Sequence, residues 1–158
     1  MNRKIAPTNL VILFATTFFL TIVPSAQADE HQECSNATLQ GGFGYTATGV
    51  LLPPTTPSPF AGPFGEIGRQ TFDGNGNTEG TASASANGNP INFTITGTYN
   101  VNPDCTGSMT LFVSPIGATV HIDFVMDKNG TEIRTIGTDP GAVETRVYRK
   151  QFTGDGDD

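Results

Sequence analysis

The residues best suited to acid–base chemistry recur with one spacing in the second half of the chain. Three pairs lie two positions apart: His121 and Asp123, Glu132 and Arg134, and Glu144 and Arg146. Residues two apart share a face of an extended strand. If that face points into an interior, His121 and Asp123 are candidates for an acid–base pair, with Arg134 as an anion clamp. If it points outward, the pairs are surface ion pairs worth tenths of a kcal/mol each. Alternating apolar residues on the same strands compete for the interior, so we expect these charged pairs to lie on the outer wall.

A second polar cluster resembles a calcium loop in its spacing. Asp73, Asn75, Asn77 and Glu79 alternate oxygen-bearing side chains. An EF-hand loop needs Gly at its sixth position and Glu at its twelfth, where this chain has Thr78 and Ala84. Asp-Gly and Asn-Gly are also strong hairpin-turn dipeptides. We therefore expect a turn here, with no metal and no cofactor.

Period-2 alternation of apolar and polar residues dominates the chain after residue 37, and turn-forming clusters interrupt it. Residues 91–101 are the clearest example, because Ile, Phe and Tyr alternate there with Thr and Asn. The pattern predicts eight strands, at residues 38–49, 64–72, 78–87, 91–101, 105–114, 118–127, 131–138 and 143–152. Most connections are short, which favours antiparallel pairing of consecutive strands. We therefore predict an all-β domain, a single eight-stranded antiparallel up-and-down (meander) barrel of calycin-like type.

The first 28 residues have the order of a cleavable signal peptide. Arg3 and Lys4 precede an apolar run at 10–23, and Ala26-Gln27-Ala28 supplies small residues for cleavage. A run of about 14 apolar residues is too short for a membrane-spanning helix, which needs roughly 20. We expect a secreted or periplasmic protein of domain 29–152, followed by an acidic, flexible tail at 153–158, and no membrane span after processing. A transmembrane barrel is disfavoured because the chain has no Trp for aromatic girdles.

Net charge and cysteine content narrow the range of partners and the cellular compartment. Without residues 1–28 the chain has 6 basic and 15 acidic residues, a net charge of −9, which excludes nucleic acid as a partner. Cys34 and Cys105 are the two cysteines, and in an oxidising compartment they are expected to form one disulfide. In a meander, the strands after these two cysteines begin at the same end of the barrel. We therefore expect the disulfide to hold the N-terminal arm across that end.

The opposite end of the barrel is where we expect a ligand site. Residues 50–63 form a long connection with five prolines, either a lid or an irregular surface loop. Aromatic candidates for ligand contact are Phe60, Phe64, Tyr45 and Tyr99. The predicted apolar rows comprise Phe43, Phe93, Ile95, Tyr99, Leu111, Val120, Ile122, Phe124 and Val147. Small residues at 81–86, with Gly42, Gly44 and Gly97, either leave room for a ligand or accommodate larger neighbours; we favour a filled interior.

Four strings carry a resemblance to known proteins: CSNATLQGGFGY at 34–45, TFDGNGN at 71–77, DCTG at 104–107 and TDPG at 138–141. In these strings the chain resembles a group of small exported bacterial proteins whose function is uncharacterised. The strand count and layout are also similar, more distantly, to the allene oxide cyclase and dirigent class of barrels. That likeness is topological and transfers no catalytic residue.

The leading functional hypothesis is a non-enzymatic exported protein that binds a small apolar ligand, or a partner, at the barrel mouth. The alternatives are a cyclase- or isomerase-like enzyme acting on a hydrophobic substrate in the lumen, and a structural component of the envelope or matrix. Ionisable groups inside the barrel would favour the enzyme over the binder. The oligomeric state and the ligand's identity are left open by the sequence.

Overall fold

The computed structural model describes residues 33–151, so the predicted signal peptide and the 153–158 tail lie outside the described residues. A short 3-10 turn, η1 (Asn36–Thr38), precedes eight strands. They are β1 (Gln40–Leu51), β2 (Gly62–Asp73), β3 (Asn77–Ala86), β4 (Asn89–Val101), β5 (Thr106–Ser114), β6 (Ala118–Met126), β7 (Glu132–Gly137) and β8 (Ala142–Lys150). Each predicted strand exists, with shifted bounds: β1 starts later because η1 occupies 36–38, and Cys105 lies just before β5.

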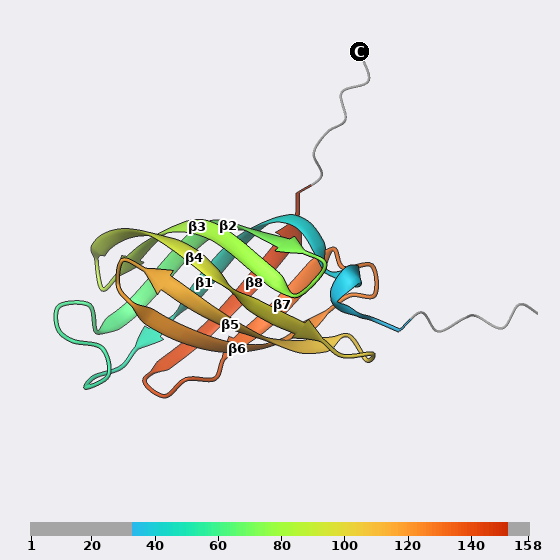
Figure 1. The fold of residues 1–158 in the computed structure, drawn as a ribbon. Helices are drawn as coiled ribbons and strands as arrows, with labels where there is room; N and C mark the ends of the chain where they lie inside the picture. Colours follow the sequence, from blue (N-terminus) through green and yellow to red (C-terminus); the bar gives the residue numbers. More distant parts are fainter. Residues whose placement is uncertain (1–32, 152–158) are drawn as a thin grey trace, which may run out of the picture. The chain divides into compact units, whose positions relative to one another are not determined.

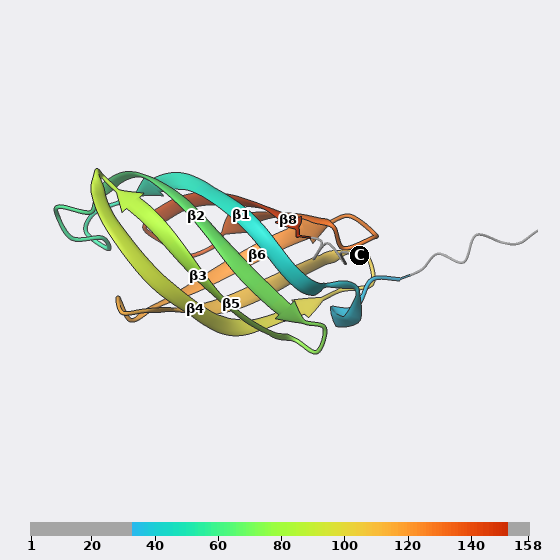
Figure 2. The ribbon, with the colours of Figure 1, turned by 90° about the horizontal axis from the view of Figure 1, so that it is seen from above.

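The strands form a closed antiparallel barrel in which every strand pairs with its neighbours in sequence. Closure comes from β1 and β8, which pair antiparallel from Phe43 opposite Lys150 to Leu51 opposite Ala142. Figures 1 and 2 show the ring of strands from two directions. The prediction of an eight-stranded up-and-down barrel is confirmed.

The two ends of the barrel carry different connections. The mouth end, as we call it, has the 52–61 loop and the turns at 87–88, 115–117 and 138–141. The disulfide end has the connections at 74–76, 102–105 and 127–131, together with η1. In Figure 1 the long loop is at the left and η1 at the right, at opposite ends. This is the arrangement that strand parity predicts.

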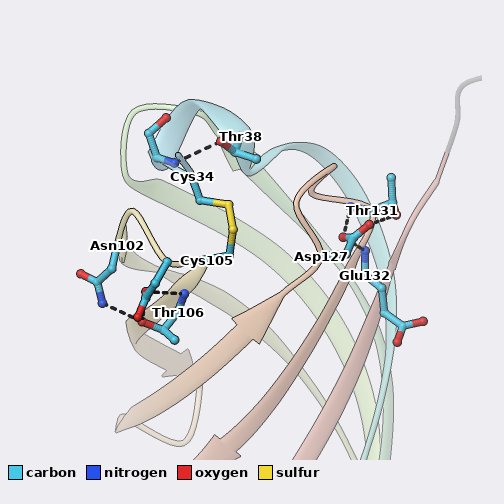
Figure 3. The surroundings of a disulfide bond; sticks show 10 residues. Cys34, Thr38, Asn102, Cys105, Thr106, Asp127, Thr131 and Glu132 are labelled. Atoms are coloured by element: carbon cyan, nitrogen blue, oxygen red, sulfur yellow. Dashed lines mark hydrogen bonds between the residues drawn. A yellow bond between two sulfur atoms is a disulfide. The ribbon is translucent and has the colours of Figure 1, made fainter. Parts of the chain in front are cut away.

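The N-terminal arm closes the disulfide end. Cys34 is bonded to Cys105 and its N–H donates to the Pro103 carbonyl (3.1 Å), so the arm begins at the β4–β5 connection (Figure 3). Further along, the Asn36 side chain accepts from the Val101 N–H at 2.8 Å. A Cβ on Gly130 would lie 2.2 Å from the Thr38 carbonyl oxygen, so the arm also touches the β6–β7 turn. The predicted disulfide is present, and the arm spans the barrel end before entering β1.

The half of the interior next to the disulfide end is densely filled. Phe43, Phe72 and Tyr99 make edge-to-face contacts, with ring centroids 5.3 and 5.2 Å apart for successive pairs. Tyr99 ties this core to the arm, because its hydroxyl donates to the Leu39 carbonyl (2.8 Å) and accepts from the Gly74 N–H (2.8 Å). Leu39 itself is completely buried. This half of the barrel is a packed core, as expected from dense apolar alternation.

The proline-rich loop at the mouth end is held by the turns on either side of it. The Leu52 N–H donates to the Gly141 carbonyl at 2.8 Å, and the Asn87 side-chain amide donates to the Pro59 carbonyl at 2.9 Å. Gly141 belongs to the β7–β8 connection and Asn87 to the β3–β4 turn. The loop is therefore part of the rim and is fixed to both neighbours.

In one strand, β8, the side chains predicted to point outward point into the barrel, and those predicted to point inward face the solvent. The sequence pattern predicts Val147 of β8 in the core, but it is 38% exposed, whereas Glu144, Arg146 and Tyr148 are buried. A one-residue change of face exchanges the whole strand's inner and outer sets. Tyr148, which is completely buried, has far more surface to remove from water than Val147, and it brings Arg146 and Glu144 inward with it.

Candidate functional site

The catalytic candidates from the sequence all lie on the outer wall. His121 pairs with Asp139 of the β7–β8 connection, not with Asp123, through a 2.7 Å contact from Nδ1 and a 2.6 Å hydrogen bond from its backbone N–H. Slight burial raises the pKa of Asp139, but the hydrogen bonds from His121 outweigh it and hold that pKa below its usual value. Arg134 is 72% exposed and donates to Glu132 at 2.8 Å. Asp123 is also exposed and, with Arg134, lines an open groove on the outside of β5–β7.

The aromatic candidates do not form one site. Tyr99 is at the disulfide end, where its hydroxyl holds the arm. Phe60 is half-buried in the rim loop, and Phe64 is half-buried against the core at the start of β2. Tyr45 is buried in the middle of β1. Of the glycines expected to make room inside, Gly42 and Gly44 face outward towards Arg69 and Gln151, and Gly97 faces Leu111.

The polar group that the fold does bring together is inside the barrel. We call it the inner cluster: Tyr45 of β1, Glu66 of β2, and Glu144, Arg146 and Tyr148 of β8. Each of these residues is at most 7% exposed. The strand register explains the meeting, because Ala47 pairs with Glu66 on one side and with Arg146 on the other. The small Ala47 side chain leaves the space in which the two charged groups approach.

Hydrogen bonds and ion pairs connect the members of the inner cluster. The Tyr45 hydroxyl donates to Glu66 Oε1, and Arg146 Nε donates to Glu144 Oε1. Arg146 Nη1 lies 3.5 Å from Glu66 Oε1, and its guanidinium lies over the Tyr45 ring, 5.5 Å from the centroid. The Tyr45 and Tyr148 rings stack with centroids 4.7 Å apart. A Cβ at Gly68 would be 2.5 Å from the Tyr45 ring, so this glycine makes room for the tyrosine.

Burial controls the electrostatics of the inner cluster. It raises the pKa of Glu66, and Glu144 raises it further, against the lowering by Arg146 and the Tyr45 hydroxyl. Burial also raises the pKa of Tyr45, with a further contribution from Glu66, and raises that of Tyr148 to about 12. For Arg146 burial lowers the pKa, but Tyr148, Glu144 and Glu66 outweigh it and the net shift is upward. The cluster thus holds a permanent cation beside a carboxyl that resists ionisation.

A second polar chain lies below the inner cluster and belongs to the core. The Tyr148 hydroxyl donates to Gln70 Oε1 at 3.2 Å, and Gln70 Nε2 donates to Thr78 Oγ1 at 2.9 Å. Thr78 in turn donates to the Thr71 carbonyl at 2.8 Å. Gln70 is completely buried, and these bonds satisfy its amide group. This chain holds the Tyr148 hydroxyl in place beside the inner cluster.

Sequence reasoning missed Glu66 and placed Glu144 and Arg146 on the wrong face. One signal was available for Glu66, because it shares the parity of Phe64 and Phe72, two apolar residues that reach the core. The same parity places Gln70 inside. For β8 the equivalent signal was Tyr148, a large aromatic residue on the same face of the strand as Glu144 and Arg146.

No metal centre is found among residues 33–151, since no three His, Cys, Asp or Glu side chains there are grouped to hold an ion. The Asp73 cluster is a turn, in which the Asp73 carboxylate accepts from the Asn75 and Asn77 N–H groups at 2.7 and 2.9 Å. A hydrogen bond from the Asn77 side chain, and then these two backbone bonds, hold the pKa of Asp73 below its usual value. Within the described part of the chain no helix has the length and apolar character to cross a bilayer.

Comparison with known proteins returns no relative. No protein-family model matches the chain, and neither the curated proteins nor the solved structures contain a match. The fold and the inner cluster define a closed eight-stranded β-barrel with an acid–base group buried in its interior.

Proposed function

We propose that the protein is exported and binds a small, largely apolar ligand inside the mouth half of the barrel. The disulfide between Cys34 and Cys105 is consistent with an oxidising compartment outside the cytoplasm. The signal-peptide pattern of residues 1–28 supports the same location.

The observation that carries the proposal is a gradient of burial along the inner face. Towards the disulfide end, inward side chains such as Phe43, Leu111 and Ile133 are completely buried. Towards the mouth, four inward apolar side chains are only half-buried, namely Phe64, Ile91, Phe93 and Val120, although Val113 and Ala86 at the same end are buried. Apolar side chains that line an interior and are still reached by solvent are typical of ligand sites.

Small residues at the same level leave these aromatic and aliphatic groups uncovered. Ala84 and Ala86 of β3 share the inward parity, and they pair with Glu66 and Phe64 of β2. Gly49 of β1 lies under the Phe64 ring, which an added Cβ would meet at 2.7 Å. Glu66 and Glu144 of the inner cluster lie opposite Ala84 and Gly49 in the register, so the cluster would lie beside a bound molecule.

The test is native mass spectrometry of protein purified from its own host's envelope, followed by titration with the apolar fluorophore N-phenyl-1-naphthylamine. We expect a retained small molecule, and saturable fluorophore binding once it is removed. Ala84→Leu fills the inner face and is expected to weaken binding at least about tenfold, since it occupies the ligand's space. Ser85→Leu, the outward neighbour on β3, is the matched control and should bind as the wild type does.

Two results would contradict the proposal. One is that the protein retains no molecule and binds no fluorophore. The other is that Ala84→Leu and Ser85→Leu bind equally well, because binding would then be on the outer wall.

A cyclase- or isomerase-like enzyme is the second candidate, and one observation favours it: Glu66, Glu144 and Arg146 project inward beside the proposed ligand. Such groups can move protons at a bound substrate. Incubating the recovered molecule with wild-type protein and with Glu66→Gln distinguishes the two functions. An enzyme converts the molecule to an isomer only with Glu66 intact, and a binder leaves it unchanged in both samples.

A further inference from the structure

Two buried polar atoms in the described part of the chain lack a hydrogen-bond partner, and they are neighbours in the register. They are Thr135 Oγ1 and Arg146 Nη1. Thr135 of β7 pairs directly with Arg146 of β8, and both side chains point into the barrel. Thr135 is 7% exposed and the Arg146 side chain 4%, so water reaches neither freely. Buried polar atoms without a hydrogen bond are rare in native proteins, and the nearest acceptor to Nη1, Glu66 Oε1, is 3.5 Å away.

A ligand group that binds both atoms has to be an acceptor, because Nη1 can only donate. Arg146 can only donate, and the Thr135 hydroxyl can donate as well. A carbonyl oxygen has two lone pairs and can accept from both groups at once. The two donors belong to residues that are register partners on adjacent strands, so a single acceptor between β7 and β8 could be shared by both.

The surrounding charge excludes a carboxylate as that acceptor. Arg146 is already paired with Glu144 through Nε and lies 3.5 Å from Glu66. One cation faces two carboxyl groups, and with Glu144 in its ion pair the net charge of the inner cluster is zero or negative, according to whether Glu66 is protonated. A carboxylate ligand would add a further negative charge in a buried place, which is unfavourable without a free cation.

A glycine lies on β7 between the mouth and this pair of donors. Gly137 follows Thr135 by two residues on β7 and therefore shares its inward face, nearer to the mouth. It has no side chain, and the first atoms that an added Cβ would meet are those of Glu144, at 3.4 Å. Between the mouth and Thr135 the inward face of β7 therefore carries no side chain of its own, and Glu144 of β8 lies against it.

We propose that Thr135 and Arg146 bind the carbonyl oxygen of an uncharged, otherwise apolar ligand, and that the inner cluster rejects the corresponding carboxylate. This inference rests on the proposed function and adds the chemical class of the ligand. Ketones, esters and amides belong to that class, and free fatty acids do not.

The experiment measures displacement of N-phenyl-1-naphthylamine by three probes of equal chain length: 2-undecanone, undecanoate and undecane. At pH 7.5 we expect the ketone to bind about tenfold more tightly than either of the others, which is the typical benefit of a hydrogen bond to a charged donor. Thr135→Val keeps the shape of the side chain and removes its hydroxyl. It should reduce the affinity for the ketone about fivefold and leave that for undecane unchanged. Thr145→Val, on the outer face of β8, is the matched control.

The outcomes separate this inference from the proposed function. If none of the probes displaces the fluorophore, the proposed function fails and the inference fails with it. If undecane or undecanoate binds as tightly as the ketone, a ligand site exists but the carbonyl preference is refuted. The wild-type probe series decides this even if Thr135→Val does not fold. If Thr135→Val folds and keeps the full ketone preference, Thr135 is not a ligand-binding residue and the inference is overturned.

Discussion

Replacing both disulfide cysteines by serine, Cys34→Ser with Cys105→Ser, tests how the barrel end is stabilised. The bond joins residues 71 positions apart, so it removes a large loop from the entropy of the unfolded chain. For a loop of this length the chain-entropy relation corresponds to about 4 kcal/mol at 25 °C. Typical domains have only about 5–15 kcal/mol of total stability, so this loss is a large fraction.

The double variant is nevertheless expected to fold, because the arm keeps its other contacts. Tyr99 still donates to the Leu39 carbonyl, and Asn36 still accepts from the Val101 N–H. Urea unfolding followed by far-ultraviolet circular dichroism measures the free energy of unfolding of both proteins. The wild type treated with dithiothreitol is the chemical control and should match the double variant.

A loss below about 1 kcal/mol would refute the reasoning, since it would mean that the unfolded chain is not restrained by this bond. If the double variant lacks the circular dichroism spectrum of the barrel in the absence of urea, the expectation that it folds is refuted. The arm's remaining contacts would then be insufficient to close the disulfide end.

Three further predictions concern buried polar groups. Arg146→Met leaves Glu144 and Glu66 buried without their cation and should cost about 3–5 kcal/mol of unfolding free energy in urea, whereas Arg134→Met on the outer wall should cost less than about 1 kcal/mol. Tyr99→Phe removes the hydroxyl that bonds to the arm, and should cost about 1–3 kcal/mol and increase amide hydrogen exchange in residues 36–39; equal exchange in both proteins would contradict this role. The raised pKa of Glu66 means that its contribution to stability is complete below its unfolded value of about 4.5 and is lost as the pH rises through the folded value. Glu66→Gln keeps Tyr45 and Arg146 beside the substituted side chain. Its melting temperature should therefore rise relative to that of the wild type as the pH increases above the unfolded value of Glu66. A melting-temperature difference that stays constant with pH would contradict the raised pKa of Glu66.

Strand number, antiparallel order, the disulfide and the two ends of the barrel could be predicted because each depends on local patterns. Alternation marks a strand, and turn residues mark its end. Parity then places every connection at one end or the other. The face of β8 could not be predicted in the same way. Val143 and Val147 lie on one face of β8, and Tyr148 lies on the opposite face. Which face turns inward depends on how well its side chains pack against the neighbouring strands.

The inner cluster was inaccessible to sequence reasoning for a related reason. Glu66 and Arg146 are 80 positions apart, and they meet because Ala47 lies between their strands in the register. No local pattern encodes that meeting. Charged residues were expected on the outer wall because burying them is unfavourable, and for His121, Asp123 and Arg134 the structure agrees. The exceptions are the residues that we now associate with a ligand.

The closed ring has a consequence for aggregation. An open sheet ends in two outermost strands whose backbone groups can recruit another chain, whereas a ring in which β1 pairs with β8 has no outermost strand. Residues 89–93 of β4 extend beyond the register with β5, which begins at Thr94 opposite Ser114. That short segment includes Pro90, which has no N–H to offer an incoming strand. A protein built in this way is protected against fibril formation at concentrations at which an open sheet of the same composition would polymerise.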